Sequence, residues 1–189
     1  MIYYLHGFTS APASWKARAL HERMAGRGLQ DAFWCEQLPV SPKAAISMIE
    51  AAVAARRDAA PTFVGSSLGG FYATCLAEKL DAKAVLINPA VLAPLVLEKW
   101  LGEHENLYTG EHFVLTPTHI EELRRLDLPA VTRPERYWLL VETGDETLDW
   151  RVAVARYVGA RQTVCEGGDH SFTRFPDYLD EIVAFAALA

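Results

Sequence analysis

The sequence contains few of the features that mark disulfide-rich, zinc-binding or nucleic-acid-binding proteins. Only three of its 189 residues are cysteines, and Cys35, Cys75 and Cys165 lie far apart with no C-x-x-C pair. Neither a disulfide framework nor a zinc knuckle is therefore expected. The 18 Lys and Arg residues are outnumbered by 24 Asp and Glu, which gives a net charge of −6. This acidic balance argues against a nucleic-acid groove or an anionic membrane surface as a partner.

Long apolar segments are missing as well. The most apolar stretch, residues 84–97, is too short to span a bilayer and contains Asn88, Pro89 and Pro94. The first residues have no basic region, no long apolar run and no small-residue cleavage site. We therefore expect no membrane span and a cytoplasmic location.

The composition is that of an ordinary soluble globular protein, with 51% hydrophobic and 22% charged residues. The length suits one compact domain, residues 1–189, with a sizeable core. No internal repeat, low-complexity tract or domain boundary interrupts it.

Short apolar runs alternate with segments of helical periodicity along the chain. The expected helices begin near Pro12, at Pro42, after Ser67, near Trp150 and near Tyr178. Strands that are apolar throughout, each followed by a helix, predict a mostly parallel six-stranded sheet with helices on both faces. The expected strands are residues 2–5, 33–38, 62–64, 83–87, 137–141 and 162–165.

One segment breaks this alternation. Residues 89–134 show no strand pattern and are too long for an ordinary connection. An insertion between two strands of an α/β sheet suits a small cap over the site, here about residues 91–134. The alternative is a pair of helices that pack on the sheet edge.

The most informative motif is Gly65-x-Ser67-x-Gly69, which directly follows the apolar run 62–64 and precedes a helical pattern. Strand, sharp turn and helix are the context in which G-x-S-x-G forms a nucleophile elbow. Glycine is needed on both sides of the serine because the turn brings backbone segments very close together. The sequence therefore predicts that Ser67 is a nucleophile whose hydroxyl is exposed by a strained turn.

A serine nucleophile needs a base, and the base needs an acid. His170 lies in a glycine-rich loop after the last expected strand, and Asp145 directly follows the strand before it. The order Ser67, Asp145, His170 is the one used by α/β-hydrolases. Glu146 and Asp149 are close enough in sequence to compete with Asp145, although Asp149 more plausibly caps the helix that begins near Trp150.

Two backbone N–H groups are expected to form an oxyanion hole. One is that of Leu68, the residue after the nucleophile, and the other is that of Phe8 in the loop after the first strand. Gly7 allows the turn, and His6 is expected to orient the loop. A glycine loop after a first strand can also bind phosphate, which is the alternative role for this segment.

Several motifs together resemble the small bacterial YqiA-type esterases of the α/β-hydrolase superfamily, and the resemblance covers essentially the whole chain. It implies a single-domain α/β-hydrolase fold and a carboxylic-ester hydrolase with Ser67, Asp145 and His170 as the triad and no cofactor. The larger superfamily usually has two more strands before the H-G loop, and their absence fits the minimal architecture of the small esterases. The motifs are His6-Gly7-Phe8, Gly65-Ser66-Ser67-Leu68-Gly69-Gly70, Asn88-Pro89-Ala90, Thr143-Gly144-Asp145-Glu146 and Gly167-Gly168-Asp169-His170-Ser171-Phe172.

Other functions remain open at this point. The same triad would serve an acyl-thioesterase, because only the leaving group differs. A non-catalytic ligand-binding protein on a hydrolase scaffold is a further alternative. A nucleotide-binding domain fits poorly, because the glycines at 65, 69 and 70 do not match G-x-G-x-x-G. We expect a small-molecule ester or thioester as the substrate, and the sequence does not indicate an oligomeric state.

The expected cap contains other residues that could bind a ligand. His104, His112 and His119 match no short-range zinc spacing, so no metal site is expected. Three aromatic residues either line an acyl pocket or pack the cap: Trp100, Tyr108 and Phe113.

Overall fold

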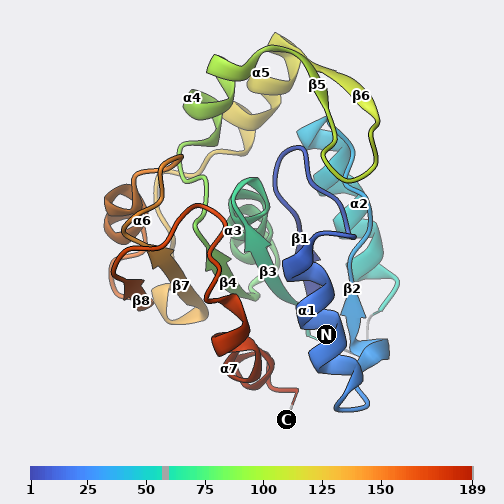
Figure 1. Ribbon diagram of the computed structural model, residues 1–189, viewed down its shortest axis with the longest axis vertical. Coiled ribbons are helices and arrows are strands. Elements are labelled where there is room, and N and C mark those ends of the chain that lie inside the picture. Colours follow the sequence, from blue (N-terminus) through green and yellow to red (C-terminus); the bar gives the residue numbers. More distant parts are fainter. Residues whose placement is uncertain (57–59, 189) are drawn as a thin grey trace.

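A six-stranded sheet runs through the middle of the molecule (Figure 1). The computed structural model describes residues 1–56 and 60–188. The strand order is β2-β1-β3-β4-β7-β8, and every neighbouring pair is parallel. This confirms the predicted sheet. The strands are β1 (Ile2–Leu5), β2 (Phe33–Trp34), β3 (Thr62–Ser66), β4 (Lys83–Ile87), β7 (Tyr137–Glu142) and β8 (Arg161–Cys165).

Helices cover both faces of the sheet, which explains why the central strands β1, β3, β4 and β7 are almost completely buried. Successive side chains of a strand point to opposite faces. Tyr3 and Leu5 join a core with α2 (Pro42–Ala54), α3 (Leu68–Leu80) and α6 (Trp150–Arg156). Ile2 and Tyr4 join a second core with α1 (Trp15–Ala25) and α7 (Leu179–Phe185). Short 3-10 turns complete the main domain at Gln30–Ala32 and Phe175–Tyr178.

Several expected boundaries were wrong, including the two that follow. The first helix begins at Trp15, because the chain before it forms a turn in which Ser14 N–H bonds to Ala11 O. Strand β2 ends at Trp34 and does not reach residue 38. Beyond it the chain leaves β1 and bonds to the loop after β1, where Gln37 Nε2 donates to Ser10 O. By contrast, α2 begins at Pro42 as predicted.

The insertion between β4 and β7 lies beyond the carboxyl ends of the central strands, at the top of Figure 1. It contains α4 (Ala93–Leu97), a hairpin of β5 (Gly102–Glu105) and β6 (His112–Leu115), and α5 (Pro117–Leu126). The 3-10 turn Glu98–Trp100 joins α4 to β5, and a second one, Pro134–Arg136, directly precedes β7. The prediction that this segment has no strands was wrong. Strand β5 has the polar sequence GEHE, so no apolar alternation reveals it.

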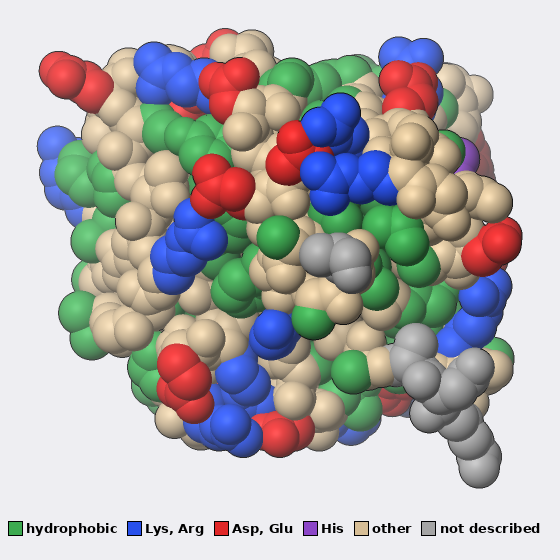
Figure 2. Space-filling model, turned by 90° about the horizontal axis from the view of Figure 1, so that it is seen from below, with side chains coloured by type: hydrophobic (Ala, Val, Ile, Leu, Met, Phe, Trp, Pro, Cys, Tyr) green, Lys and Arg blue, Asp and Glu red, His purple; other side chains and the backbone are tan. Residues whose placement is uncertain are grey.

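The face opposite to the insertion carries basic side chains beside acidic ones (Figure 2). Exposed ion pairs of this kind join Arg23 of α1, and Arg27 just after that helix, to Asp180 of α7. Such pairs contribute little individually because water and salt screen them. Among the described residues, no helix has both the length and the apolar character needed to cross a membrane.

Candidate active site

Ser67 lies at the turn between β3 and α3, with φ 55° and ψ −120°. A non-glycine residue with positive φ is strained and persists only where neighbouring contacts hold it. Here Ser67 N–H donates to Ile87 O at 3.0 Å, and Ser67 O accepts from Gly70 N and Ala90 N at 2.9 and 3.0 Å. These bonds hold the serine at the carboxyl end of the sheet in the strained conformation that the motif predicts.

The two glycines of the motif sit where no side chain fits. A Cβ on Gly65 would lie 2.2 Å from Gly69 O, and a Cβ on Gly69 would lie 1.9 Å from Leu5 O. Both obstacles are backbone atoms, which cannot move without disturbing β1 or α3. The expected close approach of backbone segments is therefore confirmed.

His170 and Asp145 meet Ser67 in a continuous line of hydrogen bonds. His170 Nε2 lies 3.1 Å from Ser67 Oγ, and His170 Nδ1 lies 2.8 Å from Asp145 Oδ2. Because a carboxylate only accepts, Nδ1 carries the proton and Nε2 is left to accept from the serine hydroxyl. The side chain of Asp145 is 2% exposed, and its Oδ1 accepts the N–H groups of Thr147 and Leu148 at 2.8 Å.

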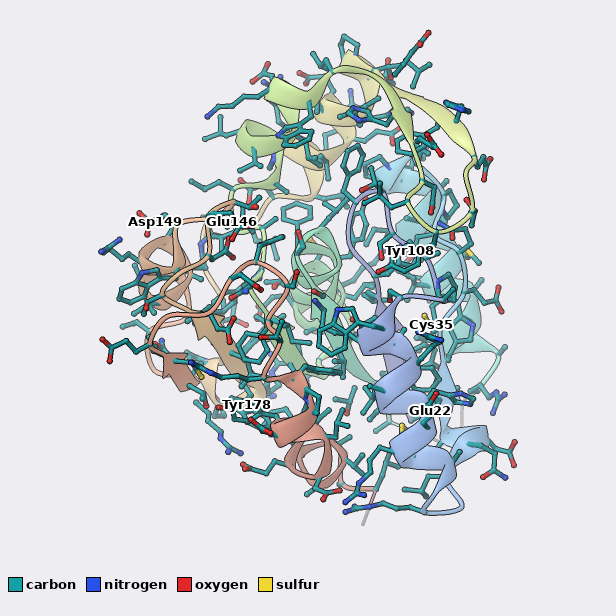
Figure 3. All side chains as sticks on the ribbon, in the orientation of Figure 1. Glu22, Cys35, Tyr108, Glu146, Asp149 and Tyr178 are labelled. Atoms are coloured by element: carbon teal, nitrogen blue, oxygen red, sulfur yellow. The ribbon has the colours of Figure 1, made fainter. Side chains whose placement is uncertain are left out.

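The two acids that could compete with Asp145 are used elsewhere. Figure 3 shows Glu146 and Asp149 close to the start of α6. Asp149 Oδ1 accepts Arg151 N–H at 3.0 Å and caps α6, as the sequence predicts. Glu146 Oε2 accepts the backbone N–H of His170 at 3.1 Å, so it contacts the main chain of the histidine and not the ring. Bonds from its own backbone N–H and from that of His170 lower the pKa of Glu146.

Asn88 is a site residue to which the sequence assigned no role. It follows β4 with φ 39° and is buried. Its Oδ1 accepts Glu142 N–H at 3.0 Å, and its Nδ2 donates to Asp169 O at 3.1 Å and His170 O at 3.3 Å. One side chain therefore ties the ends of β4 and β7 to the loop that carries the histidine. In the sequence, Asn88 stood out only as part of the Asn88-Pro89-Ala90 motif of the family resemblance, directly after an expected strand.

Glu142, the last residue of β7, is a second buried group that the sequence did not single out. It is 0% exposed, and its Oε2 accepts Asp169 N–H at 2.8 Å. The loop passes so close that a Cβ on Gly168 would lie 2.1 Å from Glu142 Cδ. The glycines before His170 thus allow the loop to close over this carboxylate.

The loop after β1 lies against the serine. A Cβ on Gly7 would be 3.3 Å from Ser67 Cβ and 3.8 Å from Ser67 Oγ. Within residues 1–56 and 60–188, the backbone N–H groups of Phe8 and Leu68 donate to no protein acceptor. Both groups are therefore free to bind an oxygen atom held at Ser67.

His6 holds this loop in place, as expected. Its Nε2 accepts Leu38 N–H at 3.0 Å and its Nδ1 lies 3.0 Å from Gly7 O. This pattern requires the neutral ring, because one nitrogen donates and the other accepts. Burial lowers the pKa of His6 and favours the same neutral form.

The β5–β6 hairpin packs on the same loop. The Phe8 ring meets the edges of His104 and Phe113 at centroid distances of 5.0 and 5.5 Å. Asn106 Nδ2 donates to Ser10 O at 2.8 Å. The insertion therefore contacts the segment that carries one of the expected oxyanion donors.

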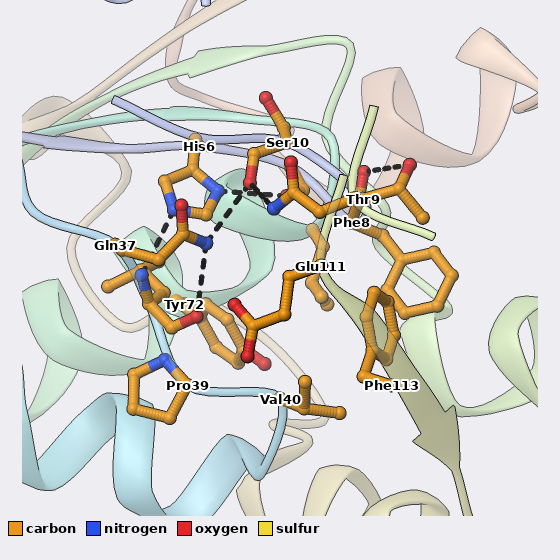
Figure 4. Close-up of a pocket in the computed structure, with 14 residues that line it drawn as sticks. His6, Phe8, Thr9, Ser10, Gln37, Pro39, Val40, Tyr72, Glu111 and Phe113 are labelled. Carbon is orange, nitrogen blue, oxygen red and sulfur yellow. Dashed lines mark hydrogen bonds between the residues drawn. The ribbon is translucent and has the colours of Figure 1, made fainter. Parts of the chain in front are cut away.

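Residues of this loop line two pockets. The first, which we call the apolar pocket, measures about 230 Å³. Leu38, Val40 and Phe113 contribute to its walls, and Figure 4 shows the Glu111 carboxylate pointing across it toward Tyr72. The second, the polar pocket, measures about 170 Å³ and contains both Ser67 and His170 in its lining. Gly7, Phe8 and Ser10 line both.

The aromatic residues and histidines of the insertion have separate roles. Phe113 lines the apolar pocket and Tyr108 the polar pocket, whereas Trp100 is 52% exposed. His119 Nδ1 accepts Thr116 N–H and completes a capping box at the start of α5. His104 Nε2 lies 2.5 Å from Trp100 O. In the part of the chain that the structure describes, no three His, Cys, Asp or Glu side chains are grouped closely enough for a metal ion.

Comparisons with known proteins agree with this architecture. Residues 1–187 match the profile of the uncharacterised protein family UPF0227. The mouse alpha/beta hydrolase domain-containing protein 10 is 19% identical, with a TM-score of 0.71 over 99% of this chain and 88% of that one. Est1E from Butyrivibrio proteoclasticus, solved with ferulic acid bound, is 14% identical, with a TM-score of 0.66 over 98% and 87%. A monoacylglycerol lipase from Paleococcus ferrophilus is 14% identical, with a TM-score of 0.69 over 100% and 94%. At these identities the three structures show a shared α/β-hydrolase fold.

Proposed function

This chain belongs to the UPF0227 family of YqiA-type proteins, and we propose that it is a serine hydrolase that cleaves carboxylic esters through an acyl-enzyme. The observation that carries the proposal is the line of hydrogen bonds from Ser67 through His170 to Asp145. The names of two structural neighbours, a monoacylglycerol lipase and a lipolytic enzyme, support the same reaction class.

In the first half of the reaction, His170 Nε2 takes the hydroxyl proton while Ser67 Oγ bonds to the ester carbonyl carbon. The carbonyl oxygen gains the negative charge and accepts the N–H groups of Phe8 and Leu68. Loss of one such donor typically lowers the rate about 10²- to 10³-fold. Asp145 holds the ring in the correct tautomer and stabilises the imidazolium.

In the second half, the C–O bond to the alcohol breaks and His170 gives its proton to the departing oxygen. His170 then takes a proton from water, whose oxygen attacks the acyl carbon. The acid leaves and Ser67 regains its proton. Every proton in this cycle is moved by a residue of the chain, so the proposal includes no cofactor.

We also assign residues 91–134 the role of a cap within a single domain, residues 1–189. The support is structural: the hairpin bonds to the loop that carries Phe8, and Glu111 and Phe113 form part of the apolar pocket. Changes in the hairpin are therefore expected to alter substrate preference more than the chemistry at Ser67.

The test is hydrolysis of 4-nitrophenyl acetate by the wild type and Ser67→Ala. We expect the variant to lose more than about 10⁴-fold in kcat, and a fluorophosphonate probe to label the wild type at Ser67 only. Ser47→Ala, an exposed serine on α2, is the matched control and should keep full activity. Retention of wild-type activity by Ser67→Ala would refute the assignment.

The same assay separates the alternatives. An acyl-thioester turned over much faster than the matched oxygen ester would identify a thioesterase. A wild-type protein that is neither labelled nor active on either substrate would be a non-catalytic binding protein on a hydrolase scaffold.

A further inference from the structure

The polar pocket differs from the apolar pocket in charge. Its lining includes Lys16, and among the described residues no aspartate or glutamate lines it. The apolar pocket has the opposite character, because Glu111 lines it and no lysine or arginine of the described chain does. An ester that lies across Ser67 would therefore meet two different electrostatic environments.

Lys16 is buried, with 9% of the residue exposed. Its Nζ donates to Ser171 O at 2.6 Å and lies 5.1 Å from the centre of the Trp15 ring. An ammonium group has three N–H donors, so two remain for another partner. In residues 1–56 and 60–188 no carboxylate forms an ion pair with Lys16.

Three carboxylates that do not line the pocket interact electrostatically with the Lys16 ammonium. Each of them accepts a hydrogen bond from another residue. Asp169 Oδ1 accepts Ser171 N–H, Glu142 Oε2 accepts a backbone N–H, and Asp145 contacts the imidazole. Burial lowers the pKa of Lys16 to about 8, and these carboxylates oppose the shift. At pH 7 the ammonium therefore keeps its proton.

Ser14 gives independent evidence for a ligand. It occupies the N-cap position of α1, where a serine normally accepts a backbone N–H of the first turn, yet its side chain makes no such bond. Its Oγ is buried and has no partner among the described residues, and the residue is only 6% exposed. Ser14 lines the polar pocket. A buried hydroxyl without a partner is costly unless a ligand satisfies it.

The start of α1 adds to the preference for negative charge. The amino end of a helix carries a partial positive charge and unpaired N–H groups, and α1 has 11 residues with no acidic residue in its first turn. Lys16 lies in that turn, where a second positive charge is unfavourable unless an anion compensates both. Figure 3 shows Tyr108 of the hairpin above this end of α1, and Tyr108 also lines the pocket.

The chemistry at Ser67 indicates which part of an ester would enter the polar pocket. The departing oxygen must receive its proton from His170, which lines the polar pocket but not the apolar pocket. The alcohol portion therefore belongs in the polar pocket. The acyl group then lies in the apolar pocket, beside Leu68.

We propose that the polar pocket binds a carboxylate on the alcohol portion of the substrate, with Lys16 and Ser14 as hydrogen-bond donors. The substrate class is then a small acyl ester of an alcohol or phenol that bears a carboxylate. A single negative charge is the better match, because the pocket has one lysine and a volume of about 170 Å³. This inference rests on the proposed ester-hydrolase function.

The experiment compares kcat/KM for 3-acetoxybenzoate with that for 3-acetoxybenzamide, which has the same acyl group but no charge. We expect the wild type to prefer the carboxylate about tenfold or more. Lys16→Met should lower this ratio about ten- to hundredfold, the usual worth of a hydrogen bond to a charged group. Ser14→Ala should lower the same kcat/KM ratio by a smaller factor, and Lys16→Arg should keep most of the preference for the carboxylate. Lys43→Met, an exposed lysine of α2, is the matched control and should leave the ratio unchanged.

An equal rate on both esters in the wild type would overturn the inference, and so would an unchanged ratio in Lys16→Met. If Lys16→Met does not fold, competitive inhibition of 4-nitrophenyl acetate hydrolysis by benzoate and benzamide replaces it. Benzoate should then bind the wild type at least about tenfold more tightly, and equal inhibition would refute the site. Hydrolysis of both esters without preference would leave the proposed function intact, whereas hydrolysis of no ester would contradict that function.

Discussion

Replacing Asn88 by alanine tests how the fold positions the histidine. The change removes three hydrogen bonds of a buried side chain, one accepted from Glu142 N–H and two donated to Asp169 O and His170 O. At about 0.5–1.5 kcal/mol for each bond, plus the cost of polar groups left unpaired, the free energy of unfolding should fall by about 3 kcal/mol. Alanine at φ 39° adds backbone strain of about 1 kcal/mol.

Activity should fall for a separate reason. Without the two bonds from the asparagine amide, the loop that carries His170 is no longer attached to the end of β4. A displacement of about 1 Å at the imidazole can cost about 10²-fold in rate. We therefore expect Asn88→Ala to lose about 10- to 100-fold in kcat with little change in KM, and to react with a fluorophosphonate probe correspondingly more slowly.

Chemical denaturation and single-turnover labelling of Ser67 measure the two effects separately. Asn88→Gly removes the same bonds without the strain, and Asn88→Asp keeps an acceptor for Glu142 N–H but cannot donate. The control is Thr74→Val, which removes a buried hydroxyl that bonds to Gly70 O and Tyr157 OH. It should lower the free energy of unfolding and leave kcat unchanged. Wild-type kcat in a folded Asn88→Ala protein would refute the positioning role.

Three further outcomes are expected. Gly69→Ala should lower the free energy of unfolding by about 4 kcal/mol or more and abolish soluble expression, because the new Cβ would lie 1.9 Å from Leu5 O. The control is Gly26→Ala, whose Cβ would have no contact below 3.4 Å and which should change the free energy of unfolding by less than about 0.5 kcal/mol. Burial lowers the pKa of His6 in the folded protein, whereas in the unfolded chain the pKa has its ordinary value of 6.5. As the pH falls below 6.5, the unfolded chain therefore binds a proton that the folded protein does not bind. Unfolding free energy should therefore decrease from pH 7 to pH 5, and His6→Gln should show a shallower decrease in the same denaturation series. The preference for the carboxylate ester should fall as pH rises through about 8, where Lys16 loses its proton, and a preference still constant at pH 9.5 in the wild type would contradict this.

Part of the candidate site could be predicted from residues that are adjacent in the sequence. The run Gly65 to Gly69 indicated a strained turn because its glycines flank a serine between a buried strand and a helix, and the structure has that turn. The loops of Asp145 and His170 were predictable because both residues follow strands of one parallel sheet, whose carboxyl ends share an edge.

Other parts could not be predicted because their signal is not local. In the β5–β6 hairpin, β5 is polar and β6 is a four-residue strand of which only Leu115 is buried, so periodicity does not reveal the hairpin. Asn88 and Glu142 act through bonds to a loop 27 or more residues away in sequence. Asn88 belongs to a motif of the family resemblance, but the neighbours of neither residue in the sequence indicate the bonds that it makes.

The sequence by itself determined the sheet, the strained turn at Ser67 and the order of the three candidate residues along the chain, since these depend on burial patterns and backbone sterics within short segments. The tertiary structure alone decided what surrounds them. Lys16 lies beside Ser171 although 155 residues separate them, and Ser14 lines the same pocket as Ser67 because α1 begins at that edge of the sheet. Strand order and helix packing bring such side chains together, and neither is encoded in the local periodicity of the chain.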